Sequence, residues 1–206
     1  WDHGVDLAGK RIAVIGNAAS AVQFVPQIAP LAAQLTIFQR SANWLMPRKD
    51  CLYSPRLHRW MGRWPWLARL RHQFQWFFFG EMQLTPLMKQ VRVVQWLATI
   101  KSKMHLRRQV KDPALRAKLT PDYPIGAKRV LFNDDYYPAL NRTNVRLVTD
   151  GIERIEAAGV RTKQGELVAA DVIIYATGFQ ATDFLAPMTV TGAGGRNLHD
   201  EWKAGA

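Results

Sequence analysis

The stretch RIAVIGNAASAVQ, residues 11–23, constrains the fold of this chain more than any other stretch. It consists of an apolar strand, residues 11–16, a turn of small residues and the start of an apolar helix. An uninterrupted apolar strand is typical of a parallel sheet that is buried on both faces. A helix over residues 18–33 and a second strand over 35–39 complete a unit of the size expected for a β-α-β motif. The stretch therefore predicts an α/β fold of the nucleotide-binding type.

The turn of this unit has only one of the three glycines that a dinucleotide-binding loop uses. Such a loop needs a glycine for the tight turn, a second where the pyrophosphate approaches the backbone, and a third where the helix packs on the strand. Gly16 takes the first place, Ala18 the second and Ala21 the third. The methyl group of Ala18 stands where a phosphate has to come close. The unpaired amides and positive end of the helix still favour an anion, so the turn predicts a site that Ala18 weakens.

The end of the second strand indicates which dinucleotide is bound. Gln39, Arg40 and Ser41 follow Gly16 by 23 to 25 residues, where an NAD-binding fold places a carboxylate for the ribose 2′-hydroxyl. No carboxylate is present here. Arginine followed by a hydroxyl suits a 2′-phosphate, which favours NADP over NAD. The alternative is that Arg40 is simply an exposed arginine at the end of a strand.

Positive charge is concentrated in the middle of the chain. The formal net charge is +12 over 206 residues, and residues 48–129 contain 18 Lys and Arg but only 4 Asp and Glu. This segment is also rich in tryptophan and phenylalanine. We consider four interpretations: a helical insert with solvated basic faces, a surface that rests on a membrane, an electrostatic funnel for anionic cofactors, and nucleic-acid binding. No nucleic-acid-binding motif supports the last, so no nucleic-acid partner is expected.

Other residue patterns exclude several classes of protein. The single cysteine, Cys51, rules out an internal disulfide framework and fits a reducing compartment, so we expect a cytoplasmic protein. The five histidines are scattered without metal-ligand spacing, and no metal site is expected. No apolar run approaches the roughly 18 residues of a membrane-spanning helix.

The sequence pattern predicts helices followed by strands in the rest of the chain. Residues 55–119 are expected to be helical, with interruptions near Pro65, Gly80, Pro86 and Pro113. From Asn144 onwards the pattern changes to strands over 144–150, 152–163 (with a turn at Gly159) and 166–178. The pair Gln164-Gly165 indicates a hairpin turn.

Three blocks of the sequence, in this order and spacing, resemble the flavin-dependent Baeyer–Villiger monooxygenases. They are GKRIAVIGNAASAVQFVPQIAPLAAQLTIFQRSANWLMPR, GAKRVLFNDDYYPALNRTNVRLV and DVIIYATGFQATDFLAPM. Trp1 stands where the family's signature Phe-x-Gly-x-x-x-His-x-x-x-Trp ends, so we expect the chain to be a fragment of a longer protein. The resemblance is weak over residues 50–120, where the family has a variable helical insert.

The resemblance implies roles for particular residues. Arg129 resembles the active-site arginine that stabilises the negatively charged C4a-peroxyflavin. Arg40, Ser41 and Lys128 are expected to bind the 2′-phosphate, and Thr177 and Gly178 to lie where the chain returns towards the flavin domain. The residues expected to line the pyrophosphate are Gly16, Asn17, Ala18, Ala19, Ser20 and Gln23. The alternative for Lys128 and Arg129 is two ordinary loop cations, and for Thr177 and Gly178 an ordinary strand end.

The resemblance also implies a domain plan for a flavoprotein with two dinucleotide-binding domains. Residues 1–49 would begin a Rossmann-like NADP-binding domain, 50–125 would form the basic insert, and 126–170, including a β-meander, would complete the domain. Residues 171–206 would return to the FAD domain. FAD would be bound mainly by a missing N-terminal part, so the fragment alone is expected to be inactive.

The activity implied is NADPH- and FAD-dependent oxygenation, with O2, of a ketone or aldehyde to an ester or lactone. Two alternatives stay open at this point. One is a flavin monooxygenase that oxygenates nitrogen or sulfur, and the other is a non-catalytic module that binds NADP or docks on a membrane.

Overall fold

The computed structural model describes residues 2, 4–48, 50, 52–89, 91–178 and 188–202. Trp1, Cys51 and residues 179–187 of the third block therefore lie outside the described residues.

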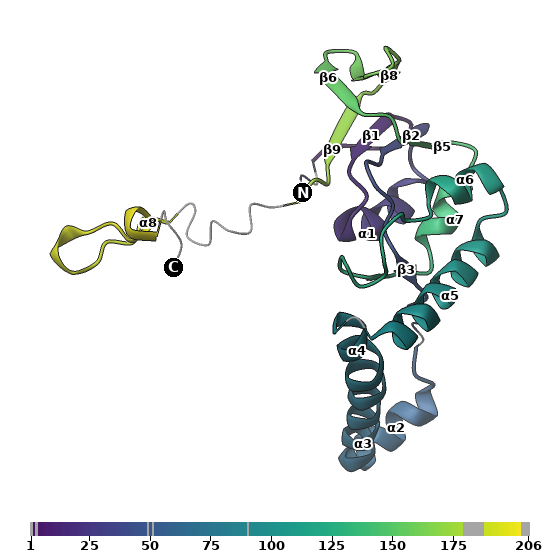
Figure 1. The fold of residues 1–206 in the computed structure, drawn as a ribbon, viewed down its shortest axis with the longest axis vertical. Helices are drawn as coiled ribbons and strands as arrows, with labels where there is room; N and C mark the ends of the chain where they lie inside the picture. The colour runs from purple at the N-terminus through teal and green to yellow at the C-terminus, as the bar shows by residue number, and fades with distance from the viewer. Residues whose placement is uncertain are drawn as a thin grey trace.

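A four-stranded parallel sheet lies at the centre of the molecule (Figure 1). Its strands, in spatial order, are β5 (Val145–Val148), β2 (Gln34–Phe38), β1 (Arg11–Ile15) and β9 (Val172–Tyr175). All three neighbouring pairs are parallel, so the chain crosses over between them. The predicted α/β fold with a β-α-β unit is confirmed.

Helix α1 (Ala19–Ile28) joins β1 to β2 and ends five residues before the expected Ala33. Pro30 follows the helix and has no amide hydrogen with which to continue it. Pro26 lies inside the helix and leaves the carbonyl of Val22 without its usual donor. The side-chain amide of Asn133 donates to that carbonyl at 3.3 Å, so a distant residue compensates for the proline.

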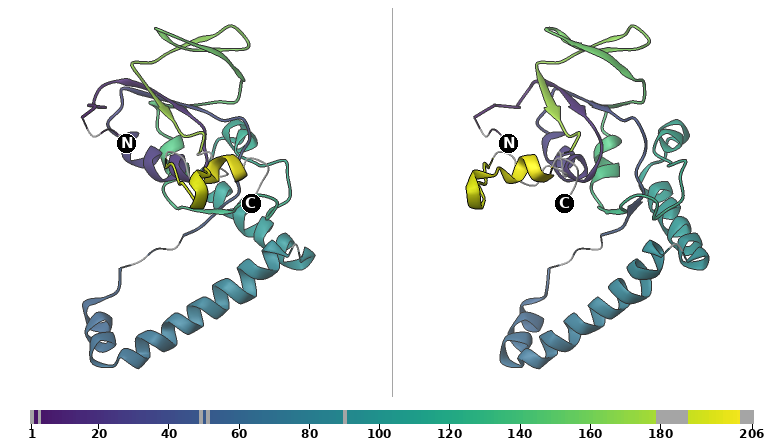
Figure 2. Two further views of the ribbon diagram at one scale, coloured as in Figure 1. Left: turned by 90° about the vertical axis from the view of Figure 1, so that its left-hand side faces the viewer. Right: turned by 60° about the vertical axis from the view of Figure 1, so that its left-hand side comes forward.

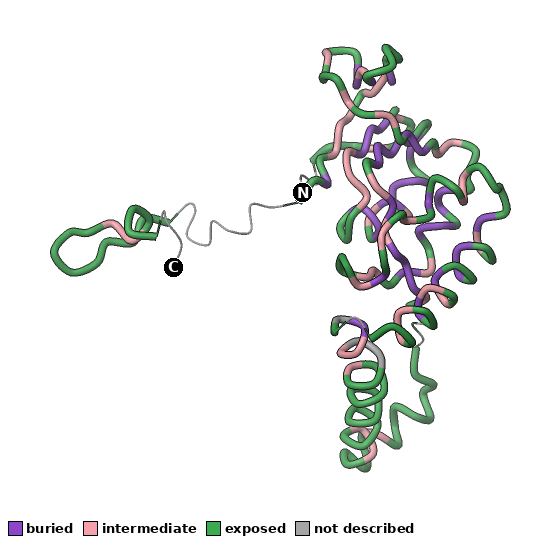
Figure 3. The backbone as a smooth tube through the Cα atoms, viewed as in Figure 1, coloured by how far each residue is buried: buried purple, intermediate pink, exposed green. Residues whose placement is uncertain are grey.

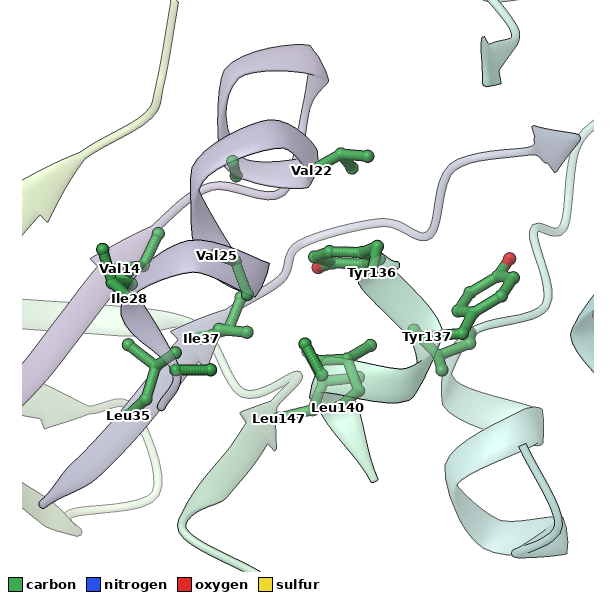
Figure 4. Close-up of a cluster of buried hydrophobic side chains, with 14 of the residues drawn as sticks. Val14, Val22, Val25, Ile28, Leu35, Ile37, Tyr136, Tyr137, Leu140 and Leu147 are labelled. Atoms are coloured by element: carbon green, nitrogen blue, oxygen red, sulfur yellow. The ribbon is translucent and has the colours of Figure 1, made fainter. Parts of the chain in front are cut away.

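The main core fills the space between the sheet and the helices on one face (Figure 4). Alternate residues of β1 and β2 point into it, as the two-residue period of a strand requires. Helix α7 (Tyr136–Leu140) closes this core, and the side chain of Asn133 accepts from the amides of Asp135 and Tyr136 at its start. The labelled side chains of the core are Val14, Val22, Val25, Ile28, Leu35, Ile37, Tyr136, Tyr137, Leu140 and Leu147.

A three-stranded antiparallel meander contributes a second, smaller core on the other face of the sheet. Its strands are β6 (Ile152–Glu156), β7 (Gly159–Thr162) and β8 (Leu167–Ala169). Val160 and Val168 of the meander pack against Ala13, Phe38 and Val148 of the sheet. The predicted hairpin turn at Gln164-Gly165 is confirmed, with Gly165 at φ 88°.

Two expectations for this region are wrong in detail. Residues 166–178 form two strands rather than one, because Ala170 and Asp171 separate β8 in the meander from β9 in the sheet. Gly159 is the first residue of β7 rather than the turn; a side chain there would collide with the backbone of Val168. Strand β9 thus belongs to the central sheet, although it follows the boundary expected at residue 170.

The middle of the chain forms helices that extend away from the sheet (Figure 2). The helical arm, residues 55–88, comprises α2 (Pro55–Arg63), α3 (Pro65–Gln75), the π-helical segment η1 (Trp76–Leu84) and α4 (Thr85–Met88). Pro65 begins α3, as predicted, but Gly80 does not interrupt the helix. A glycine in a helix costs only about 1 kcal/mol, and the stacked rings of Phe74 and Phe78 hold the preceding turns together.

The remaining elements connect the helical arm to the sheet. Helix α5 (Arg92–Gln109) packs against β3 (Leu45–Met46), which pairs with β4 (Leu131–Phe132). Leu87 at the base of the arm is buried in a cluster with Trp44, Met46, Ala98 and Ile125. The other short elements are α6 (Pro113–Lys118), η2 (Ala193–Gly195) and α8 (Leu198–Glu201). Among the described residues, no helix is long and apolar enough to cross a membrane.

The ion pair of Arg11 with Asp171 gives a testable pH dependence. Hydrogen bonds from the Arg11 side chain and amide lower the pKa of Asp171 from 3.8 to about 2. Because the folded pKa is lowered, this contribution to stability is present above pH 3.8 and is lost as the pH falls towards 2. The urea midpoint of the parent protein should therefore fall over this range more steeply than that of Asp171→Asn. Both side chains are partly exposed, so the difference should be small. Parallel pH profiles would contradict the assignment.

Candidate functional site

The turn after β1 is held close to two neighbouring strands. The amide of Gly16 donates to the carbonyl of Phe38 at the end of β2. Gly16 has φ 106°, and a Cβ atom there would lie 2.5 Å from the carbonyl oxygen of Ala176, just after β9. No side chain fits this gap. Gly16 therefore makes the tight turn, as predicted for the first glycine. The segment that leaves no room for a side chain here is the one that follows β9.

Helix α1 begins without a capping side chain. Ala18 is the N-cap residue with φ −80° and ψ −163°, an extended conformation that any residue adopts, and its side chain makes no capping hydrogen bond. The first amides of a helix have no acceptor within it, so those that follow Ala18 are available to an anion. Ala18, Ala19, Ser20 and Gln23 are exposed around this end. Ala21 is fully buried, which agrees with close packing of helix on sheet at the third position.

Asn17 connects the turn to the end of β2. Its side-chain amide donates to the side chain of Gln39 and to the carbonyl of Ser41, both at 2.9 Å. Its own carbonyl accepts from the side chain of Asn43 at 2.9 Å. Gln39 is buried and donates in turn to the carbonyl of Lys118, at the end of α6. The side chain of Asn17 is thus used to hold the turn in place.

A group of cations and hydroxyls lies beyond the end of β2. The ammonium group of Lys128 lies 3.5 Å from the hydroxyl of Ser41 and 4.4 Å from the centre of the Tyr123 ring. The Tyr123 hydroxyl donates to the carbonyl of Ala42, which holds the ring beside this strand end. Arg40 is exposed and has no ion pair within the described part of the chain. The sequence has no Asp or Glu between residues 7 and 49 or between 123 and 133.

The remaining predicted residues lie at two chain segments around this turn. Arg129 follows Lys128, is exposed, and has no carboxylate partner among the residues that the structure describes. Thr177 and Gly178 follow β9 and are exposed. The Thr177 amide lies 3.4 Å from where a Cβ of Gly16 would be, so this segment lies directly beside the turn.

The structure thus brings together the turn after β1, the end of β2, and the segment after β9, and it joins Lys128 to Ser41. Within the described part of the chain, neither Arg40 nor Arg129 forms a hydrogen bond or an ion pair with this group. Sequence reasoning missed the supporting roles of Gln39, Asn43 and Tyr123. For Gln39, the sequence did offer a signal, because a polar amide at the end of an apolar strand is buried and needs hydrogen-bond partners. No group of three or more His, Cys, Asp or Glu that could hold a metal occurs among the described residues.

Comparison with known proteins gives relatives along the whole chain. A Baeyer–Villiger monooxygenase of Streptomyces coelicolor is 42% identical over 208 residues, which cover all of this chain and 39% of the relative. A Baeyer–Villiger monooxygenase of Pseudomonas aeruginosa is also 42% identical, over all of this chain and 38% of the relative. An FAD-binding monooxygenase of Aspergillus niger, ktnD, is 43% identical, over all of this chain and 34% of the relative. No protein-family model matches the chain.

Solved structures of monooxygenases also match nearly the whole chain. A steroid monooxygenase bound to NADP superimposes with a TM-score of 0.78 and 30% identity, over all of this chain and 46% of that one. The monooxygenase OTEMO in complex with FAD and NADP superimposes with a TM-score of 0.77 and 28% identity, over 99% of this chain and 44% of that one. The chain spans about two fifths of the length of the curated relatives that it matches.

The close approach of Gly16 to Ala176 can be tested by adding one methyl group. Gly16→Ala should lower the free energy of unfolding by about 2–4 kcal/mol, because it combines a strained φ with displaced backbone. Gly165→Ala is the matched control: Gly165 also has positive φ, 88°, but nothing lies within 4 Å of its Cβ position. Urea unfolding of both variants separates strain from collision. Equal losses in the two variants would show that the contact with Ala176 is not tight.

Proposed function

We propose that this chain, which is related along its whole length to part of the Baeyer–Villiger monooxygenases, is the NADP-binding part of an NADPH- and FAD-dependent monooxygenase. Its reaction is the oxygenation of a ketone or aldehyde to an ester or lactone, with O2 as the second substrate. Homology and fold support the class of enzyme. The geometry of the site supports the proposed binding of the 2′-phosphate and of the pyrophosphate.

The observation that carries the proposal is the cationic group at the end of β2. Lys128 lies beside Ser41, Arg40 is the adjacent residue, and the surrounding sequence has no carboxylate. A carboxylate here would bind a ribose 2′-hydroxyl, whereas cations and a hydroxyl bind a 2′-phosphate. The ring of Tyr123 lies on one side of the Lys128 ammonium group, and the hydrogens not directed at Ser41 would donate to a phosphate.

The turn fits the rest of the dinucleotide. Gly16 lets the chain turn tightly, and the unpaired amides after Ala18 face the side from which a pyrophosphate would approach. Asn17 and Gln39 hold the turn against the strand ends, so little ordering is left for binding. Ala19, Ser20 and Gln23 provide the exposed rim around the same helix end.

The proposed FAD site lies mainly in the part of these flavoproteins that this chain does not span. When bound, NADPH supplies a hydride, and the flavin supplies the chemistry that inserts one oxygen atom of O2 beside a carbonyl. Thr177 lies beside the turn, and Gly178 follows it in the chain. Arg129 is proposed to direct a permanent positive charge towards the reacting end of the cofactors, where it would stabilise developing negative charge.

We place the enzyme in the cytoplasm, because its single cysteine fits a reducing compartment. Peripheral contact of the enzyme with a membrane through the basic insert is a separate proposal.

Cofactor preference tests the binding site. In the full-length gene product, Arg40→Ala should raise the Kd of NADPH about 10- to 100-fold, because one hydrogen-bonded charge contributes about 1.5–3 kcal/mol. The Kd of NADH should stay almost the same, because NADH has no 2′-phosphate. Arg142→Ala, which removes an exposed cation elsewhere, is the control and should change neither. Ionic strength must be fixed, since salt screens these contacts. Equal losses for both cofactors would show that Arg40 only maintains the loop.

The role of Arg129 predicts a split between cofactor oxidation and product formation. Arg129→Ala in the full-length gene product should lower ketone oxygenation about 10²–10³-fold, as loss of one preorganised electrostatic contact does. NADPH oxidation should continue without matching product, and Arg129→Lys should recover part of the product yield. Product analysis beside NADPH consumption measures both. Oxygenation near the parent rate in Arg129→Ala would remove Arg129 from the active site.

A further inference from the structure

Most residues of the helical arm, residues 55–88, are exposed (Figure 3), and large apolar side chains are concentrated among them. Helices α2 and α3 have no buried residue, and Leu87 at the base anchors the arm to the body. Along α3 and η1, Leu70, Phe74, Phe78 and Met82 recur every four residues, which places them on one side of the helix. Each of them is exposed.

The aromatic residues of η1 surround the helix. Trp76, Phe77, Phe78 and Phe79 are consecutive, so their side chains point in successive directions around the axis, yet each is 41–60% exposed. A helix that is apolar all round is normally buried, either in a protein core or in a membrane, so these uncovered rings require a further partner. Sequence alone could not give this observation, because it depends on all four rings being uncovered.

Unpaired arginines lie next to these aromatic residues. Arg56, Arg59 and Arg63 follow one another at helical spacing on α2 and, with Trp60 and Trp64, line an open groove of about 490 Å³. None of the three has a carboxylate partner within the described residues. Residues 51–80 contain five arginines and no Asp or Glu. Covering this groove with protein would require matching carboxylates, because a buried unpaired charge is costly.

We propose that the helical arm docks on an anionic lipid bilayer and lies in the plane of its surface. The guanidinium groups of α2 bind lipid phosphates, to which arginine is geometrically suited. The tryptophans sit at the level of the headgroups, and the phenylalanines of η1 enter the acyl boundary. None of the described helices could cross a bilayer, so the arm rests on the membrane. This proposal goes beyond the proposed function and uses none of the cofactor-binding residues.

Vesicle sedimentation of the full-length gene product tests the lipid specificity. The protein should sediment with vesicles of phosphatidylcholine and phosphatidylglycerol, and only weakly with phosphatidylcholine alone. Raised salt should weaken the binding, since screening reduces attraction to surface charge. Binding to neither kind of vesicle, or equal binding to both, would overturn the proposal.

Two sets of variants assign the binding to the arm. Replacing Arg56, Arg59 and Arg63 by glutamine should weaken partitioning into the anionic vesicles about 100-fold, since each arginine near such a surface contributes roughly fivefold. The control replaces three exposed cations of the body, Arg107, Arg108 and Lys111, by glutamine, with the same change in net charge. It should bind almost normally. Equal losses in both triple variants would show attraction by net charge rather than docking of the arm.

The second set distinguishes the membrane from another part of the same protein as the partner. Trp76, Phe77 and Phe79 are replaced by serine, and the melting temperature is measured without lipid together with vesicle binding. If the bilayer is the partner, binding is lost and the melting temperature stays within a few degrees of the parent value. A large fall in the melting temperature would show that these rings are covered by protein, and would overturn the proposal. NADPH affinity should be unchanged, so this result is independent of the cofactor site.

Discussion

The structure of the site depends on the close approach of Gly16 to the carbonyl of Ala176. This contact, together with the hydrogen bond from Gly16 to Phe38, brings the ends of β1, β2 and β9 to one point. Residues that are 160 positions apart in sequence then form one surface, and the start of α1 faces it. A methyl group at Gly16 would separate β9 from the turn and move Thr177 with it. The carboxyl ends of parallel strands form ligand sites because the chain can leave the sheet there, and here one missing side chain determines how closely the segments meet.

Neutral hydrogen bonds maintain this surface, and in the proposed site the cations would provide its affinity for anions. Asn17, Gln39 and Asn43 bond to one another or to main-chain carbonyls, so their polar atoms are satisfied without charge. The cations Arg40 and Lys128 are exposed and therefore keep most of their hydration until a ligand replaces it. This division has a physical basis: buried neutral amides fix geometry at low cost, whereas a buried cation would need a permanent partner and could not serve an incoming phosphate.

The sequence predicts the sheet and the turn because both follow from local patterns. The unbroken burial of Ile12, Ala13 and Val14, and the positive φ that favours glycine at position 16, follow from residues that are adjacent in sequence. Most of the contacts that sequence reasoning missed join residues far apart in sequence. The carbonyl freed by Pro26 is satisfied by Asn133, and Lys128 is positioned by Tyr123 and Ser41. Nothing in the residues around Pro26 indicates where its compensating donor is. Gly80 differs, because its helix is held by a local ring contact, between Phe74 and Phe78, that the glycine itself does not make.

The positive charge of the chain serves two surfaces with different physics. At the strand ends, Lys128 lies against Ser41 and Tyr123, which fixes its position, and in the proposed site it would distinguish a phosphate from a hydroxyl. On α2, Arg56, Arg59 and Arg63 stand on an exposed helix whose aromatic neighbours are also uncovered. Such a set recognises a surface rather than a single group, because any of several phosphates can pair with each arginine. Positively charged side chains thus give selectivity where they are held by neighbours and avidity where they are repeated along a helix. The net charge of +12 does not by itself indicate phosphate binding or lipid binding. The placement of the cations relative to their neighbours distinguishes these two proposed uses.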